Sequence, residues 1–263
     1  MKFQFDDCEF SLWDSKYEKD LFLVTVSGSH RFGWVKPDSD LDVKLVWIPD
    51  LMQALSVKYK GKNKHKRTEI NNNKILCLES KPIVNFFYEL TKGNGNNLEW
   101  LFMPPLHQKP EAVEEIKKLT IDNLHKGFLG HYLGYYSKSL KKDMDNPSRL
   151  KKYGLEKLLL CSYRVLRTGI ILGQTKQVIY NVQEQDKFGF GDCCNDILSY
   201  YLNDKKLSEE QIETAKMELD LYEDYLKTIK EKSEWSDIFP SVVYDRWLTK
   251  HYTGIIEEGL SYK

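Results

Sequence analysis

Apolar positions in the first hundred residues fall into short runs separated by turns. Three runs are rich in Val, Leu and Ile and have the length of buried strands: Leu21–Val26, Leu41–Ile48 and Ile75–Glu79. Pro82 opens a helical pattern that runs to about Thr91, and a Gly-Asn-Gly segment ends it. This part of the chain predicts a small mixed sheet with helices.

After Pro104, Pro105 and Pro110 the apolar spacing becomes helical. Helices are predicted over residues 111–123, 130–142, 155–172, 208–232 and 245–258. Ser208, followed by two glutamates, is a typical N-terminal cap for the fourth of them. We therefore predict an α+β protein with an α/β domain over residues 1–105 and an all-helical domain over residues 106–263.

Composition limits the partners and the compartment. Among 263 residues, 39 basic side chains balance 39 acidic ones, so contact with nucleic acid would need a local basic patch. The five irregularly spaced cysteines favour free thiols in a reducing compartment over a zinc site or a disulfide framework. No apolar run is long enough for a membrane span and the first residues do not resemble a signal peptide, so we expect a cytoplasmic protein.

The candidate chemistry lies where the first predicted strand ends and the second begins. Gly28 and Ser29 follow one strand, and Asp40 and Asp42 open the next. Alternate residues of a strand share a face, so the two carboxylates project together and attract a hard cation such as Mg2+. Gly28 permits close backbone approach, and Ser29 offers a hydroxyl and an amide to phosphate. The pattern indicates a site for a metal-bound nucleoside triphosphate; the alternative is an acidic turn and strand end.

This spacing resembles the signature of nucleotidyltransferases related to DNA polymerase beta. The longer string over residues 28–33 and 37–42 is similar to one branch, the RNA-repair-pathway (RlaP-like) nucleotidyltransferase family. Two later segments fit the same branch: residues 92–94 with Leu98-Glu99-Trp100-Leu101, and Lys157 with Arg164-Val165-Leu166. The resemblance extends from about Leu21 to Gly173 and implies a polymerase-beta-like domain that transfers a nucleoside monophosphate from ATP or another NTP, with Mg2+ or Mn2+.

The resemblance also implies residue roles. Asp40 and Asp42 would be the metal-binding catalytic carboxylates, and Gly28 and Ser29 would hold phosphates. The superfamily usually adds a third carboxylate from a later strand. Glu79 is the best candidate for it and Glu69 the second, although a glutamate departs from the usual aspartate and a surface acid is the alternative.

Four cations are candidates for neutralising the triphosphate. His30 and Arg31 follow the Gly-Ser turn directly, so one could reach a phosphate. Lys157 and Arg164 are seven residues apart and share one face of a predicted helix. A cationic stripe on an apolar helix needs an anionic partner. We favour the triphosphate, and a structural salt bridge between the two halves is the alternative.

A basic segment between the second and third predicted strands could bind RNA. We predict a loop or hairpin tip over Lys58–Arg67, and its candidate RNA-binding residues are Lys60, Lys62, Lys64, Lys66 and Arg67. A solvated loop is the alternative. For the helical tyrosines at positions 132, 135, 136 and 153, core packing is favoured over stacking on a base.

Three functions remain open at this point. The first is transfer from ATP or another NTP to RNA, for example to a tRNA end. The second is adenylylation of a protein, as in the minimal antitoxin branch with the same motif spacing. The third is a catalytically silent protein that binds nucleotide or RNA and regulates a partner.

Overall fold

A five-stranded mixed sheet forms the centre of the α/β part. The computed structural model describes residues 2–6, 8–11, 21–50, 64–70, 74–190 and 193–261. The strands are β3 (Leu21–Ser27), β4 (Leu41–Trp47), β5 (Lys64–Glu69), β6 (Ile75–Pro82) and β7 (Pro105–Gln108). Their order in the sheet is β5-β6-β4-β3-β7, with β4 and β6 parallel and the other neighbours antiparallel. A separate two-stranded sheet joins β1 (Lys2–Phe5) and β2 (Cys8–Ser11).

The three predicted strands are confirmed as the three central strands. All residues of β3 are buried, which explains why its sequence reads as a continuous apolar run. No strand was predicted at β5, because all six of its residues are exposed and polar or charged and so show no apolar pattern. Residues 64–67 of the predicted basic loop therefore lie on an edge strand that pairs with β6, and residues 58–63 lie outside the described residues.

The helices follow the strands in sequence and are longest in the C-terminal half. Their bounds are α1 (Ser29–Phe32), α3 (Ile83–Thr91), α4 (Gly95–Phe102), α5 (Pro110–Asp122), α6 (Lys126–Tyr135), α7 (Lys141–Met144), α8 (Pro147–Tyr153), α9 (Leu155–Thr175), α10 (Val182–Gln185), α11 (Cys193–Leu202), α12 (Glu209–Lys232) and α13 (Val242–Ser261). The predicted helix over residues 130–142 is divided into α6, a π-helical turn (Tyr136–Leu140) and α7. Ser208 caps α12 through a capping box, as expected from the sequence.

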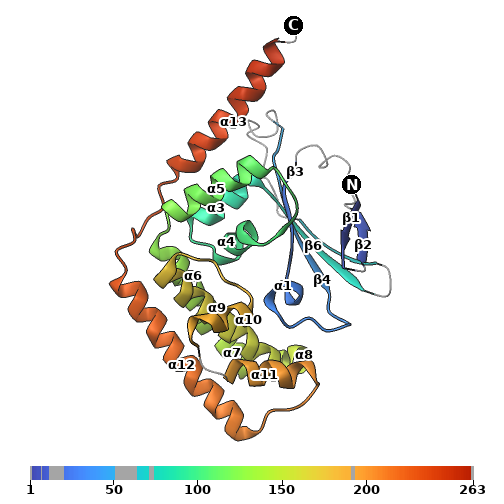
Figure 1. Cartoon of the computed structure of the whole chain (residues 1–263), viewed down its shortest axis with the longest axis vertical. Coiled ribbons are helices and arrows are strands. Elements are labelled where there is room, and N and C mark those ends of the chain that lie inside the picture. The colour runs from blue at the N-terminus through green and yellow to red at the C-terminus, as the bar shows by residue number, and fades with distance from the viewer. Residues whose placement is uncertain are drawn as a thin grey trace.

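Helix α9 is the centre of the helical part, which comprises α6 to α12. It packs against α6, α11 and α12, and most of its residues from Leu158 to Leu172 are buried. Figure 1 shows these helices grouped beyond one end of the sheet, with α3, α4 and α5 beside the sheet itself. The opening between the sheet end and α8, α9 and α11 is where the candidate site lies.

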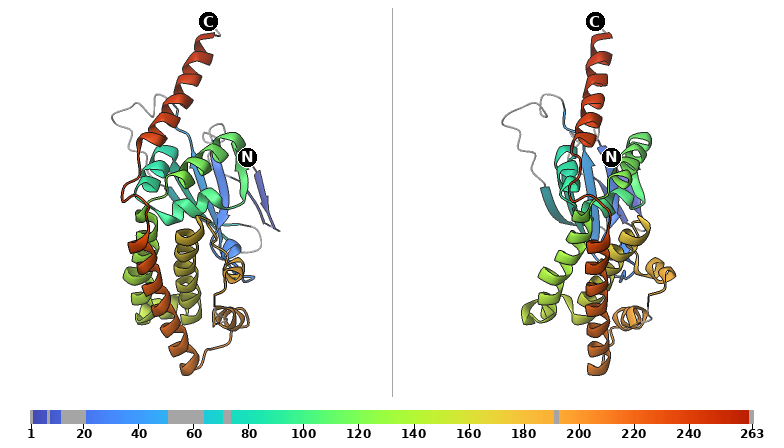
Figure 2. Two further views of the ribbon diagram at one scale, coloured as in Figure 1. Left: turned by 60° about the vertical axis from the view of Figure 1, so that its left-hand side comes forward. Right: turned by 90° about the vertical axis from the view of Figure 1, so that its left-hand side faces the viewer.

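The last helix returns to the α/β part. Figures 1 and 2 show α12 running along the helical part and α13 continuing past the sheet to the C-terminus. On α13, the Tyr244 ring stacks on Phe87 at 4.4 Å and Trp247 meets Phe22 edge-on at 5.9 Å. Together with β7, this places segments from beyond residue 105 in the α/β part. The division into two domains at that residue stays a prediction.

Within the described residues, no helix combines the length and the apolar character that crossing a bilayer requires.

His131 on α6 makes the stability of the helical part sensitive to acid. Burial, with a smaller effect from Arg164, lowers the pKa of His131 from 6.5 to about 4. The unfolded chain therefore binds a proton that the folded chain does not between these pH values, and stability falls as the pH drops through that window. The slope contributed by one such group is at most about 1.4 kcal/mol per pH unit.

We expect His131→Gln to reduce the loss of stability between about pH 6.5 and pH 4. Urea unfolding followed at several pH values measures this slope. His65→Gln, at an exposed position of β5, is the matched control. An unchanged slope in His131→Gln would show that the acid sensitivity arises elsewhere.

Candidate active site

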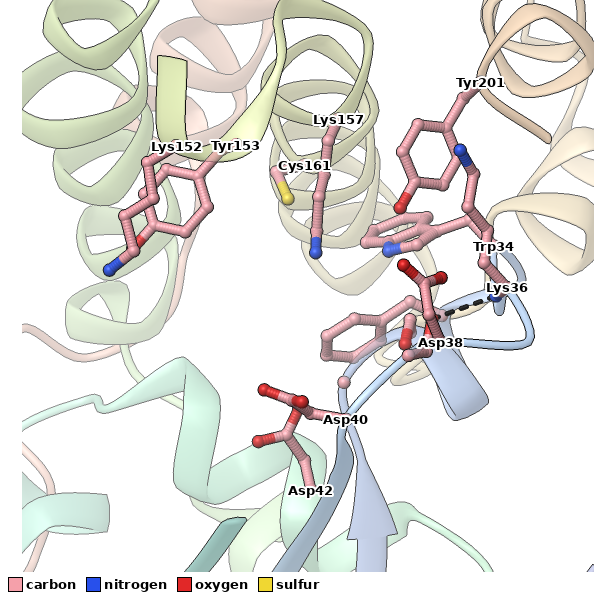
Figure 3. A pocket seen from close by; sticks show the side chains of 14 residues that line it. Trp34, Lys36, Asp38, Asp40, Asp42, Lys152, Tyr153, Lys157, Cys161 and Tyr201 are labelled. Carbon is pink, nitrogen blue, oxygen red and sulfur yellow. Dashed lines mark hydrogen bonds between the residues drawn. The ribbon is translucent and has the colours of Figure 1, made fainter. Parts of the chain in front are cut away.

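A cavity of about 460 Å3 lies between the end of the sheet and the helical part. The β3–α1 turn and the segment leading into β4 form one side, and α8, α9 and α11 form the other (Figure 3). It is lined by Gly28, Ser29, Phe32, Trp34, Lys36, Asp38, Ser39, Asp40, Asp42, Lys152, Tyr153, Lys157, Cys161 and Tyr201. We call it the larger cavity.

Gly28 and Asp42 are in close contact across two strands. Antiparallel pairing of β3 and β4 sets Ser27 opposite Asp42, so the next residue reaches the carboxylate. Gly28 has a φ of 65°, and a Cβ placed there would lie 2.2 Å from the Asp42 carboxylate oxygen Oδ2. A glycine is therefore needed here for two reasons: it adopts the positive φ of the turn, and it leaves room for the Asp42 carboxylate.

Gly28→Ala is expected to displace the Asp42 carboxylate, because the added methyl group overlaps it. The positive φ adds a cost of more than about 1 kcal/mol to the folded state. Thermal unfolding and nucleotidyl transfer should both be affected. Gly189→Ala is a matched control with a φ of 78° and no atom within 4 Å of the new Cβ. Equal behaviour of the two variants would mean that backbone strain alone matters.

Asp40 and Asp42 project together into the larger cavity (Figure 3). Burial raises the pKa of Asp42; Lys44 lowers it, and the neighbouring Asp40 raises it further. The Asp40 carboxylate accepts a hydrogen bond from Arg67 at 2.9 Å. Two adjacent carboxylates, one of them desolvated, offer the oxygen ligands that a hard divalent ion prefers. Asp40 and Asp42 are therefore the residues that could hold the metal.

A third carboxylate does not join this pair. In the parallel ladder of β4 and β6, Cys77 lies opposite Asp42, and Glu79 lies opposite Lys44. The Glu79 carboxylate is 3.2 Å from the Lys44 ammonium and 3.4 Å from that of Lys81. Among the residues that the structure describes, no group of three His, Cys, Asp or Glu side chains is arranged for a metal. Glu79 is thus held by lysines instead of completing a metal site, and Glu69 lies on the exposed strand β5.

His30 and Arg31 lie away from the larger cavity. The His30 ring meets Phe5 edge-on at 5.5 Å and lies 3.8 Å from Asp6, while burial lowers its pKa. The Arg31 guanidinium lies 5.1 Å from the centre of the Phe5 ring. Neither residue lines the cavity. The prediction that one of them contacts the triphosphate is not supported by this placement, since α1 directs both side chains toward β1.

The structure separates the roles of Lys157 and Arg164. Lys157 lines the larger cavity (Figure 3). Arg164 is 4% exposed and donates to both carboxylate oxygens of Glu99, which is 2% exposed, at 2.8 Å each. Its guanidinium also lies 4.0 Å from the centre of the Phe32 ring. Arg164 therefore forms the structural salt bridge between α4 and α9, which corrects its prediction as a phosphate ligand, because its charge is already matched.

The candidate RNA-binding residues are only partly described. Lys64, Lys66 and Arg67 are exposed on β5, and Arg67 reaches Asp40. Lys60 and Lys62 lie outside the described residues. Two of the four tyrosines, Tyr132 and Tyr136, are core residues, as favoured from the sequence. Tyr153 lines the larger cavity and Tyr135 a smaller one.

Several lining residues escaped the sequence reasoning. Lys36 lies 4.2 Å from the centre of the Tyr201 ring and pairs with Asp204 at 2.5 Å, so the loop before Asp38 is attached to the end of α11. Lys36 lies within a few residues of the motif, and this proximity is the one sequence feature that could have indicated its place in the cavity. Nothing in the sequence pairs it with Tyr201, which is 165 positions later.

A smaller cavity of about 260 Å3 adjoins the larger one at Asp42. It shares Gly28, Phe32 and Asp42 with the larger cavity. Its other lining residues are Ser27, Lys44, Glu79, Lys81, Asn94, Asn96, Glu99, Trp100, Tyr135 and Arg164. The Asp42 carboxylate thus borders two separate spaces.

The mixed sheet, the Gly-Ser turn and the carboxylate pair at the start of the adjoining strand are the features expected of a nucleotidyltransferase site. The chain belongs to the RNA repair pathway DNA polymerase beta family, RlaP, whose model matches residues 6–178. This match confirms the resemblance found in the sequence, the α+β class and nucleotidyl transfer as the general reaction. The enzyme class is thereby shown, and the matched region covers both Asp40 with Asp42 and Lys157.

Other comparisons add little. No curated protein matches the chain. Among solved structures it is similar to a nucleotidyltransferase-like protein from Exiguobacterium sibiricum, at 11% identity and a TM-score of 0.31, over 81% of this chain and 70% of that one. A likeness of this size supports no conclusion about fold or function.

Proposed function

We propose that the protein is a Mg2+-dependent nucleotidyltransferase that moves a nucleoside monophosphate from ATP or another NTP to RNA, such as a tRNA end. The observation that carries the proposal is that Ser29, Asp42 and Lys157 line one cavity. Figure 3 shows Asp42 and Lys157 there. These groups supply a phosphate contact, a metal ligand and a neutralising cation, the three requirements for handling a triphosphate.

Each residue has a distinct part in the proposed reaction. Gly28 and Ser29 hold the phosphates, and Lys157 offsets their charge from α9. Asp40 and Asp42 would hold a divalent ion, which would neutralise charge at the phosphate that is transferred. The acceptor oxygen bonds to the α-phosphorus, the bond to the β-phosphate breaks, and pyrophosphate leaves. Glu79 lines the smaller cavity together with Asp42 and is the candidate acceptor of the hydroxyl proton.

RNA is favoured as acceptor by the charge on β5. Its exposed residues include Lys64, Lys66 and Arg67, and Arg67 contacts Asp40 directly, so this basic strand leads to the carboxylate pair. Cations along an approach path bind a phosphodiester backbone regardless of sequence. The cysteines whose side chains are described are free thiols, which agrees with a reaction in the reducing cytoplasm.

Labelling identifies the acceptor. The protein is incubated with each NTP radiolabelled at the α-phosphate, with Mg2+ or Mn2+, and with total RNA, tRNA or a protein extract. Labelled RNA is the expected result. Label on protein alone would replace the RNA acceptor by protein adenylylation. Nucleotide binding without any label would identify a silent regulator.

Lys157→Met is expected to weaken binding of ATP and of inorganic tripolyphosphate by about 10- to 100-fold, since a hydrogen bond to a charged group contributes about 1.5–3 kcal/mol. Isothermal titration calorimetry measures both ligands. Lys151→Met is the control, because Lys151 is exposed on α8 and does not line the cavity. Weaker ATP binding with unchanged tripolyphosphate binding would move Lys157 away from the phosphates.

A further inference from the structure

The outer face of α12 carries three exposed apolar side chains in a row. Met217, Leu221 and Tyr225 follow one another at intervals of four residues and are 62%, 69% and 47% exposed. Residues four apart are neighbours on a helix surface, so the three form one continuous stripe. Contiguous exposed apolar side chains mark interaction sites on soluble proteins. We propose that two copies of this chain associate through this stripe, as an antiparallel pair of α12 helices centred on Leu221.

The stripe lies away from the face by which α12 packs on its own chain. That face buries Ala215, Leu219 and Leu226 and contacts α9 and α6. In the right-hand view of Figure 2, α12 lies in front of the helices that it covers, and no described segment crosses it. A surface helix needs one apolar face for its own packing. The second apolar face of α12 is therefore open to another molecule.

The stripe is symmetric about the middle of its helix. Because α12 runs from Glu209 to Lys232, Leu221 lies at its centre, with Met217 four residues before it and Tyr225 four residues after it. A twofold axis at this point brings the two copies of Leu221 together and sets each Met217 against Tyr225 of the second copy. A thioether beside an aromatic ring is a favourable contact. The stripe is thus complementary to itself, as a closed dimer requires.

The charges beside the stripe favour a second copy in the antiparallel direction. Glu210 and Lys232 lie eleven residues before and after Leu221. Glu213 lies eight residues before it and Lys227 six after, a mismatch of only about 3 Å along the helix axis. All four charged residues are exposed. Antiparallel pairing therefore brings each glutamate next to a lysine of the second copy, whereas parallel pairing would set each charge against its own equivalent.

Contacts within one chain do not oppose this pairing. Asp220 lies beside the axis, but Lys141 donates to its carboxylate at 2.7 Å, so its charge is matched before the copies meet. This hydrogen bond raises the pKa of Lys141, which therefore stays charged. Lys227 contacts Asp224 of its own helix at 3.0 Å, and both side chains are exposed. Ion pairs of this kind are weak, so Lys227 can also bind a carboxylate of the second copy.

The interface is small and lies outside the reaction site. One pair of helices buries less than the roughly 800 Å2 per partner of a standard interface, so we expect weak association with a Kd of about 10–100 μM. Among the described residues, those that line the larger and the smaller cavity include none from α12. The inference is therefore independent of the proposed function, and neither RNA nor NTP enters its test.

Sedimentation velocity of the full chain, at concentrations well below and well above this Kd, measures the association. Leu221→Asp should weaken it by at least about 30-fold, because residues at the centre of an interface dominate binding and two carboxylates would meet at the axis. Ile238→Asp is the matched control, since Ile238 is 76% exposed and lies outside α12. Thermal unfolding checks that both variants fold.

An exchange of charges tests the direction of the pair. Glu213→Lys and Lys227→Glu each set like charges together across an antiparallel pair and should weaken association by about 2- to 10-fold. The double variant with both substitutions restores opposite charges and should recover the dimer. In a parallel pair neither single variant would create a new repulsion, and the double variant would recover nothing.

Three results would overturn the proposal. A chain that stays monomeric at every concentration has no such interface. Association that survives Leu221→Asp uses another surface. A double charge variant that associates no better than the single variants excludes the antiparallel register. Loss of the dimer in Leu221→Asp, together with recovery in the double charge variant, supports the interface and its direction.

Discussion

Asp42→Asn and Asp40→Asn are each expected to lower the rate of nucleotidyl transfer by at least about 100-fold. Loss of a residue that only supports a metal ligand already costs about 10- to 100-fold, so loss of a ligand should cost at least as much. Asn keeps the size of the side chain and removes the charge that holds the ion. The effect should be larger for Asp42, because its carboxylate borders both cavities.

Single-turnover transfer from a labelled NTP measures this effect, with thermal unfolding as a check that both variants fold. Asp38→Asn is the matched control: it lines the larger cavity but is exposed on the loop before the pair. We expect a much smaller change there. Transfer that survives replacement of both Asp40 and Asp42 would remove the metal assignment and the reaction derived from it.

Arg164→Met is expected to destabilise the protein by about 3–5 kcal/mol, because it leaves Glu99 buried without its counter-charge. For a chain of this size, such a loss corresponds to a fall of about 6–20 °C in Tm. Burial raises the pKa of Glu99 and Arg164 lowers it, so the unpaired carboxyl would take up a proton more readily.

The double variant Arg164→Met with Glu99→Leu should recover much of the lost stability, since a matched apolar pair removes both buried charges. Differential scanning calorimetry on the single and double variants gives the comparison. Lys118→Met breaks an exposed ion pair with Asp122 and serves as control, with an expected effect below about 1 kcal/mol. A normal Tm with loss of triphosphate binding would return Arg164 to the role first predicted from the sequence.

The sequence predicted the features that depend on local pattern. The buried strands β3, β4 and β6 and the long helices α9 and α12 show clear apolar spacing, and α12 has a clear cap. The Gly-Ser and Asp-x-Asp motif extends from the end of β3 into β4. The motif placed Ser29, Asp40 and Asp42 around one cavity because the strand pairing fixes their positions.

The rest depended on contacts between distant segments. Lys157 and Arg164 share a helix face, yet only the placement of Glu99 on α4 decides that Arg164 is neutralised. Lys157 forms no salt bridge with any residue that the structure describes. His30 and Arg31 adjoin the motif, but both side chains contact the Phe5 ring of β1 instead of the larger cavity. Glu79 has the expected strand and the expected face, but the register that sets it opposite Lys44 of β4 is not visible in any local pattern.

The α/β part and the helical part are connected twice, once between α5 and α6 and again between α12 and α13. These two crossings meet: His125 and Ser236 form a parallel bridge, and the Lys126 amide donates to the Ser236 carbonyl at 2.9 Å. These hydrogen bonds join the two crossings, so neither can shift without breaking its pairing with the other.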